Sequence, residues 1–231
     1  MHSYFKLEMD KSITAGLDLP SFEREEIDYW LNEAIRKFVK TRYSGLNSKN
    51  EGFEQTEKRI NDLRTLIKEE FLTVSSGTTD VDKPNSYKAN LSALTYTYWL
   101  AISDEVTIQY TKLGGGTETK RQGTTQCTAD TYRSHIDDPY SEHRLHYESA
   151  KPLRLIKENY VELITDGNYS ITKYFLRYIT KPTEVVYSTV TDCDLPDHTH
   201  NEIVKIAASM ALENVEQPRY QTHLREVGSM E

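Results

Sequence analysis

The segment from Asp194 to Val215 constrains the fold most, because it has the features of a helix with a well-marked beginning. Pro196 suits a first helical turn, where its missing N–H costs no hydrogen bond. Asp194 and Asp197 would place carboxylates beside the free N–H groups and the positive end of the helix dipole. Apolar residues then recur at helical spacing and predict a stripe that packs on another element. The stripe consists of Ile203, Ile206, Ala207, Met210, Ala211 and Val215.

The same beginning occurs near the other end of the chain. Asp18-Leu19-Pro20 is followed after five residues by Glu26-Ile27, and Asp194-Leu195-Pro196 is followed after five residues by Glu202-Ile203. Two helices that share a good start signal explain this match more simply than an internal repeat does. We expect these two helices to lie close together, because the ends of a chain in one domain often meet.

The N-terminal part predicts a pair of helices. Residues 21–40 carry a broad apolar face, with acidic residues early and basic residues late, in the order that suits the helix dipole. Residues 55–70 carry a second apolar stripe at helical spacing. The polar segment 43–52 lies between them, so the pattern favours an antiparallel helical hairpin over residues 20–70.

From residue 91 to residue 181 the apolar pattern changes to period two, which predicts strands. The chain alternates over 96–102 and 106–110, and Gly114-Gly115-Gly116 then predicts a turn that returns an antiparallel strand over 117–125. Residues 74–86 are rich in Ser, Thr, Gly and Asp and predict a loop, and residues 128–136 predict a short helix.

Leu153–Thr165 and Ile171–Lys181 have the clearest strand patterns. The Asp166-Gly167-Asn168 segment between them predicts a tight hairpin turn with a positive φ at Gly167. The second strand has apolar or aromatic residues on both faces. It is therefore either central and covered on both sides, or one of its faces contacts another chain.

Together these patterns predict an α+β fold in a single domain over residues 1–231. The helical hairpin over 20–70 and a C-terminal helix over 195–215 would pack with an antiparallel sheet of hairpins, which is a β-rich meander over 91–181 with a small helical insertion. Trp30 and Met210 are expected to be buried in the core.

Composition and charge exclude several classes of protein. No apolar run reaches the roughly 18 residues of a membrane span, and the start MHSYFKLEMDKS lacks the apolar region of a secretory signal. Cys127 and Cys193 are too few for a disulfide framework. The net charge of −8 argues against a general phosphate-binding surface, but it does not exclude a protein that lets DNA pass without gripping it. The 16 tyrosines favour strands and interfaces.

Two groups of residues contain metal-ligand side chains, but neither has a metal-binding spacing. The first group comprises Cys193, Asp194, Asp197, His198 and His200. The second group comprises His135, His143 and His146. The first lacks a CxxC or HxxxH pair and the second lacks an HExxH arrangement, so we expect polar surface residues and assign no metal-binding residue.

Other short patterns also carry no assigned chemistry. Residues 114–120, GGGTETK, lack the GK[ST] ending and the following helix of a phosphate loop, so they predict a flexible hairpin tip. Lys112, Lys120 and Arg121 make this tip basic, which leaves a contact with nucleic acid or with an acidic neighbour open. The glycosylation sequons at Asn90 and Asn168 are interpreted as chance matches. No hydrolase, dinucleotide or kinase motif occurs, so no catalytic and no cofactor-binding residue is assigned.

The C-terminal half carries an ordered series of short motifs. The series runs through Asp138-Pro139-Tyr140, Lys151-Pro152-Leu153, VELITDGNY from Val161, LRYITKP from Leu176, CDLPDH from Cys193 and the helix from Glu202. In this order, over residues 95–215, the motifs resemble structural virion proteins of crAss-like tailed bacteriophages. Members of this class form rings in the neck, between the portal and the tail.

The resemblance implies a non-enzymatic protein of the virion, in its neck or tail region, that is made in the cytoplasm of a bacterial host. It implies a closed homo-oligomeric ring, a dodecamer, that contacts the portal protein and other neck or tail ring proteins. DNA would pass through the channel without specific binding, and neither a cofactor nor a membrane is implied. The alternatives are another tail or capsid accessory protein, a soluble binding module, or an enzyme whose site the sequence does not reveal.

Overall fold

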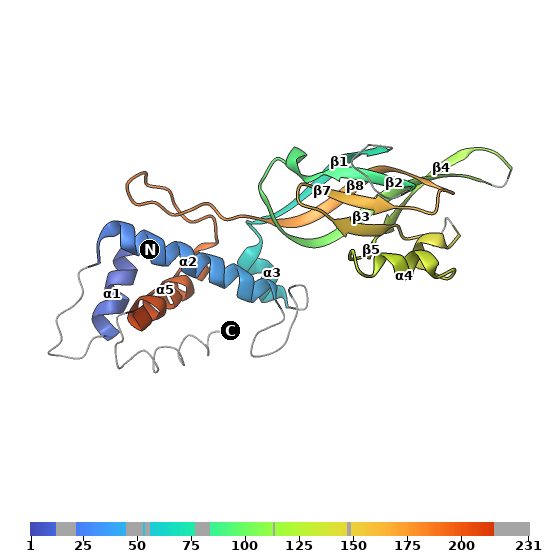
Figure 1. The fold of residues 1–231 in the computed structure, drawn as a ribbon. Coiled ribbons are helices and arrows are strands. Elements are labelled where there is room, and N and C mark those ends of the chain that lie inside the picture. Colours follow the sequence, from blue (N-terminus) through green and yellow to red (C-terminus); the bar gives the residue numbers. More distant parts are fainter. Residues whose placement is uncertain are drawn as a thin grey trace. The chain divides into compact units, whose positions relative to one another are not determined.

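The computed structural model describes residues 1–12, 22–44, 53, 56–76, 84–112, 114–146 and 149–214. Contacts divide the chain into two compact units (Figure 1). The helical unit contains residues 1–66 and 182–231, and the sheet unit contains residues 67–181. The predicted α+β class is confirmed, and the helical unit is assembled from both ends of the chain. The single domain over residues 1–231 stays a prediction.

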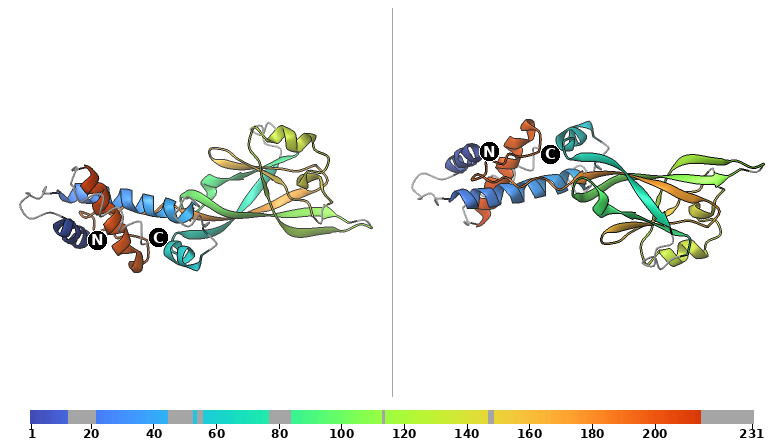
Figure 2. Two further views of the ribbon diagram at one scale, coloured as in Figure 1. Left: turned by 90° about the horizontal axis from the view of Figure 1, so that it is seen from below. Right: turned by 90° about the horizontal axis from the view of Figure 1, so that it is seen from above.

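The helical unit brings together the two helices that were predicted to meet. Its elements are α1 (His2–Ser12), α2 (Arg24–Tyr43), α3 (Glu57–Leu63), the 3-10 turn Asp197–Thr199 and α5 (His200–Asn214). Helix α5 packs against α1 and α2, and α3 packs against α2 (Figure 2). Asp18-Leu19-Pro20, the first of the two predicted helix beginnings, lies outside the described residues, as does Val215.

The predicted burial of Trp30 and Met210 is wrong, because both side chains are only half-buried. The buried face of α2 is centred on Leu31, Ile35 and Phe38, and Trp30 lies at its border. There Trp30 packs edge-to-face against Tyr29, with ring centroids 5.1 Å apart. The helical spacing therefore indicated the correct face, but it placed two large residues too near its centre.

The last helix begins close to the predicted position, but its capping differs. Pro196 precedes the 3-10 turn, and α5 follows at His200. The carboxylate of Asp194 accepts a hydrogen bond from the backbone N–H of Thr183 at 2.8 Å instead of capping the helix. The Asp197 side chain is fully exposed. Asp194 therefore fixes the segment that leads into the helix rather than the helix itself.

A buried group of charges joins three helices of this unit. The guanidinium of Arg42 in α2 donates from Nε to Asp62 in α3 at 2.9 Å, and from a terminal nitrogen to Glu202 in α5 at 2.5 Å. The Arg42 side chain is 2% exposed. Nε2 of His198 lies 3.0 Å from the second carboxylate oxygen of Asp62. Burial raises the pKa of Glu202, and the nearby Arg42 opposes that shift.

The described residues of the sheet unit form an eight-stranded sheet in the order β4-β3-β8-β1-β2-β7-β6-β5. The strands are β1 (Ile67–Ser76), β2 (Ser86–Asn90), β3 (Tyr98–Thr111), β4 (Thr117–Gly123), β5 (Thr125–Gln126), β6 (Leu153–Ile156), β7 (Tyr160–Ile164) and β8 (Ser170–Thr180). The short helix α4 (Tyr132–Asp137) lies between β5 and β6 in sequence. Neighbouring strands are antiparallel except β5 and β6, which are parallel. The expectation of a purely antiparallel sheet is therefore wrong at this edge.

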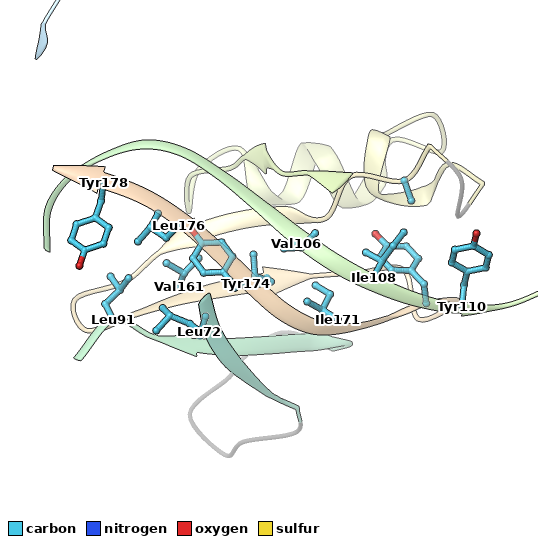
Figure 3. Close-up of a cluster of buried hydrophobic side chains, with 14 residues drawn as sticks. Leu72, Leu91, Val106, Ile108, Tyr110, Val161, Ile171, Tyr174, Leu176 and Tyr178 are labelled. Atoms are coloured by element: carbon cyan, nitrogen blue, oxygen red, sulfur yellow. The ribbon is translucent and has the colours of Figure 1, made fainter. Parts of the chain in front are cut away.

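The sheet curls around a shared apolar core. Strand β1 pairs with β8 over residues 67–73 and with β2 over residues 74–76, so it links the two halves of the sheet. Figure 3 shows Tyr174 and Leu176 of β8 gathered in this core with Leu72 of β1 and Val161 of β7. Strand β8 lies between β3 and β1, so it is central, as one of the two interpretations of its pattern required.

The predicted second helix over 55–70 is wrong beyond Leu63, where α3 ends. Ile67 begins β1, which continues to Ser76 and so takes up the start of the predicted loop over 74–86. Residues 77–83 of that loop lie outside the described residues. Leu63, Leu66 and Ile67 fit a helical stripe, but pairing of Ile67 with Ile179 places this position in a strand. Pairing with a distant strand has therefore outweighed the helical spacing of the local sequence.

Two further strand predictions require correction. Residues 153–165 form two strands, β6 and β7, which pair with each other around a turn in which Lys157 N–H donates to the carbonyl of Tyr160 at 2.9 Å. The turn at Asp166-Gly167-Asn168 has the predicted positive φ, +93° at Gly167. It does not form a hairpin, however, because β7 pairs with β2 and β6. A turn signal reports a local chain reversal and does not select the strand partner.

Replacement of Gly167 by valine is expected to lower the free energy of unfolding by about 1–3 kcal/mol, because a β-branched residue is strained at positive φ. A Cβ at this position would also lie 2.9 Å from the side-chain nitrogen of Asn85. Gly123→Val is the matched control, since Gly123 has no positive φ and no atom within 4 Å of an added Cβ. Denaturant unfolding of both variants measures the difference, and equal stabilities would contradict the turn assignment.

Arg42→Met is expected to destabilise the protein by about 3–5 kcal/mol, because it leaves the buried carboxylate of Asp62 and the partly buried carboxylate of Glu202 without their shared cation. Arg36→Met on the same helix is the control, since Arg36 is 35% exposed and pairs with Glu33 and Glu184 near the surface. Arg36→Met is expected to lower the free energy of unfolding by no more than about 1 kcal/mol. Thermal and denaturant unfolding compare the two, and similar losses would show that the buried cluster has no special weight.

Candidate assembly surfaces

The polar residues near the start of α5 make contacts within the fold. His198 contacts Asp62, and Nε2 of His200 lies 3.1 Å from the backbone carbonyl of Leu195. Cys193 is half-buried, and burial raises the pKa of its thiol. Among the described residues, no group of three or more His, Cys, Asp or Glu side chains is placed to hold a metal ion.

A pocket of about 630 Å³ in the helical unit is bordered by the N-terminus and by residues 185–200. Its two histidines are His2 and His200, and both have partners in the chain. Nε2 of His2 lies 2.7 Å from the carboxylate of Asp28, and His200 contacts Leu195. These contacts fix the orientation of both histidines at the border of the pocket.

The second histidine group contains one correction. His143 was expected on a polar surface, but its side chain is buried, and Nδ1 lies 2.9 Å from the hydroxyl of Ser141. Burial lowers the pKa of His143, which favours the neutral ring. Its backbone carbonyl accepts a hydrogen bond from Tyr169 at 3.1 Å. His135 is half-buried in α4 and His146 is exposed, so the structure does not bring the three rings together as a ligand set.

The glycine-rich segment forms the tip of the β3–β4 hairpin, as predicted. Gly114, Gly115 and Gly116 all have positive φ, and the N–H of Lys112 donates to the carbonyl of Gly116 at 3.0 Å. Lys112 also pairs with Glu118, and this contact, together with a hydrogen bond from Tyr110, lowers the pKa of Glu118. Figure 1 shows this hairpin extending past the ends of the neighbouring strands of the sheet unit.

An exposed aromatic cluster lies on the face of the sheet opposite the core. Phe71 of β1 and Phe175 of β8 are directly paired across the two strands, and their ring centroids lie 4.8 Å apart. Phe71 is 61% exposed. The guanidinium of Arg121 in β4 lies 4.1 Å from the centre of the Phe175 ring and also pairs with Glu105 of β3. We call Phe71, Phe175, Arg121 and Glu105 the aromatic–arginine patch.

The sequence identified only part of this patch. Phe175 lies within the predicted strand over 171–181, which has apolar or aromatic residues on both faces, but Phe71 lies between the predicted helix over 55–70 and the predicted loop over 74–86. A signal was present, since Glu69, Phe71 and Thr73 occupy alternate positions of one strand. Strand β1 has ten residues and one exposed aromatic residue. This pattern is too weak to outweigh the helical spacing of the apolar residues over 55–70.

A projecting segment, residues 183–192, is the second exposed feature, and we call it the arm. The arm reverses direction where the N–H of Thr191 donates to the carbonyl of Val186 at 3.1 Å. Val190 near its tip is 81% exposed and has φ of +53°. A β-branched residue at positive φ is rare and strained. Sequence analysis missed the arm because these residues show neither a helical nor a strand period.

The base of the arm is held firmly on α2. The side-chain amide of Asn32 donates to the carbonyl of Val185 at 2.9 Å and accepts from its N–H at 2.8 Å. The N–H of Tyr187 donates to the carboxylate of Asp28 at 3.0 Å, and the guanidinium of Arg24 lies 4.5 Å from the centre of the Tyr187 ring. The base of the arm is therefore fixed in position, and its tip is exposed.

The acidic balance of the chain is concentrated in the helical unit. Residues 1–66 and 182–231 contain 14 Lys or Arg and 21 Asp or Glu, a formal charge of −7, while residues 67–181 contain 14 and 15, a formal charge of −1. The arm and the turn after it carry Glu184, Asp192, Asp194 and Asp197, with no Lys or Arg between residues 182 and 204. No helix in the part of the chain that the structure describes has the length and apolarity to cross a membrane.

Comparisons with known proteins give one family and one curated relative. The sequence model of the phage tail ring protein 3/4 family matches residues 5–222. The relative is the "Ring protein 4/5" of Bacteroides phage crAss001, which is 26% identical over 214 residues, with 83% of each chain covered. The family match includes nearly the whole of both units.

Proposed function

Since the chain belongs to the phage tail ring protein 3/4 family, we propose that it is a structural, non-enzymatic subunit of a ring in the phage neck, between portal and tail. The observation that carries this proposal is the family match over residues 5–222, which includes the helical unit, the sheet unit and the arm. The curated relative supports it, because that crAss001 protein is also named as a ring protein.

The surfaces described above suit assembly better than catalysis. The aromatic–arginine patch and the arm expose residue types that are enriched at protein interfaces. The histidines at the pocket and at the start of α5 are held by contacts within the chain. A subunit that presents two different exposed features can form heterologous contacts, and such contacts close into a ring when the rotation between neighbours allows it.

We further propose a ring of about twelve copies that matches the symmetry of a portal. The portal and other neck or tail ring proteins would be its partners in the virion, after synthesis in the cytoplasm of a bacterial host. DNA would pass through the channel without specific binding. The charge of −7 on the helical unit supports this, since an acidic wall repels phosphates and would let the duplex slide.

A position farther along the tail is the second candidate. The description of the family as tail ring proteins supports this position, and the ring architecture is the same in both candidates. Another tail or capsid accessory role, or a soluble binding module, would require the chain to act without a lateral contact to its own copies. The same experiment separates all of these.

A reconstruction of the virion without imposed symmetry is expected to show this chain as a closed ring around the DNA channel, next to the portal, with about twelve copies. Each copy should bury well over the roughly 1,000 Å² that separates a biological interface from a packing contact. A ring deeper in the tail would select the second candidate. One or two copies per particle, or copies without lateral contact, would contradict the ring proposal, whereas a monomer in dilute solution would not.

A further inference from the structure

We propose that the arm of one copy docks on the aromatic–arginine patch of the neighbouring copy. This inference rests on the proposed ring, and it names the two surfaces that form the lateral contact. The occupant of the patch is thus a second copy of this chain, through residues 183–192.

The patch is already organised for a contact. Phe71 and Phe175 are held side by side by strand pairing, and Arg121 is held over Phe175 by its ion pair with Glu105. Few rotamers remain to be ordered when a partner arrives, and this lowers the entropic cost of binding. Arginine is also enriched among the residues that dominate binding energy at interfaces, and phenylalanine is enriched at interfaces.

The arm has the complementary features. Its tip offers apolar surface in Val190, which is 81% exposed. Asn32 and Asp28 fix its base, so the tip is presented in a defined conformation. Val190 has a positive φ in the turn that reverses the arm, where its N–H donates to the carbonyl of Tyr187 at 3.3 Å, and backbone strain of this kind often marks a binding element.

The charges of the two surfaces are opposite. On the outer face of the sheet, Arg121, Lys173 and Arg177 outnumber the two nearby carboxylates, Glu69 and Glu105. Lys173 and Arg177 occupy the positions on either side of Phe175 that share its face. The arm brings the exposed Asp192, followed by Asp194 and Asp197, and no basic residue. Such complementarity steers association and fixes the register of a contact.

The two surfaces are different, so the contact is heterologous. Each copy would donate its arm to one neighbour and present its patch to another, which is the pattern of contacts that a closed ring requires. If both copies used the same patch for the contact, assembly would end at a dimer. The arm and patch therefore explain why copies of this chain form rings rather than pairs.

A virion map at side-chain resolution tests the inference directly. Val190 of one copy is expected against Phe71 and Phe175 of the next copy, with Asp192 near Arg121 or Lys173. A ring whose lateral contacts lie elsewhere would overturn the inference and leave the proposed function standing. The absence of any ring would overturn the proposed function as well.

Charge reversal in phage that carry the variant gene is the second test. Arg121→Glu is expected to lower the titre of infectious particles by about tenfold or more, because it places a carboxylate opposite Asp192. Arg133→Glu is the matched control, since Arg133 is also an exposed arginine in an ion pair, with Asp137, but lies on α4. The control is expected to leave the titre unchanged.

Rescue identifies the partner residue. Asp192→Arg alone is expected to reduce the titre, and the double variant Arg121→Glu with Asp192→Arg is expected to recover most of it. Melting temperatures of the purified variants verify that each one folds, and a variant that fails to fold is replaced by Lys173→Glu with the same rescue. An Arg121→Glu titre equal to that of the control, or a loss that Asp192→Arg does not reverse, would overturn the pairing of arm and patch.

Discussion

The buried guanidinium of Arg42 is the interaction on which the organisation of the helical unit depends. Charged groups are costly to bury unless each has a partner, so Asp62 and Glu202 can be buried only when α2, α3 and α5 are all in place. Because Glu202 lies far along the chain from Arg42, this requirement brings the two ends of the chain together. Residues 67–181 then become an insertion between two parts of one helical unit. Ile67 and Ile179, at the two borders of the insertion, are paired in the same ladder.

Much of the secondary structure could be predicted from periodicity, but strand partners could not. Long amphipathic helices such as α2 and α5 contain enough turns for the apolar spacing to be unmistakable. The β3–β4 hairpin was predictable because three glycines mark its tip. Residues 157–159 end β6 without a glycine or proline, so one predicted strand proved to be two. At Gly167 the local conformation was predictable, whereas the choice of β2 as the partner of β7 depends on the whole sheet.

The sequence indicated the protein family more clearly than it indicated the candidate surfaces. The two apolar faces of β8 pointed to a central strand or a contact, but a bulge at Thr172 moves Ile171 to the core face and leaves Phe175 outside. Phe71 joins the patch only through pairing of β1 with β8, which no local pattern shows. The arm has no period at all, and its exposure depends on contacts with Asn32 and Asp28 that are distant in sequence. By contrast, ordered short motifs in the C-terminal half were enough to indicate the ring family that the comparison then matched.

The paired borders of the sheet unit have a mechanical consequence. The chain enters the sheet at the start of β1 and leaves it at the end of β8, and these two strands lie side by side. A force that pulls one unit away from the other therefore acts on two covalent connections at once. It is transmitted lengthwise along β1 and β8, against the ladders with β2 and β3, so many hydrogen bonds must shear together before the sheet opens. A chain that crossed between the units only once would carry the same force through a single strand.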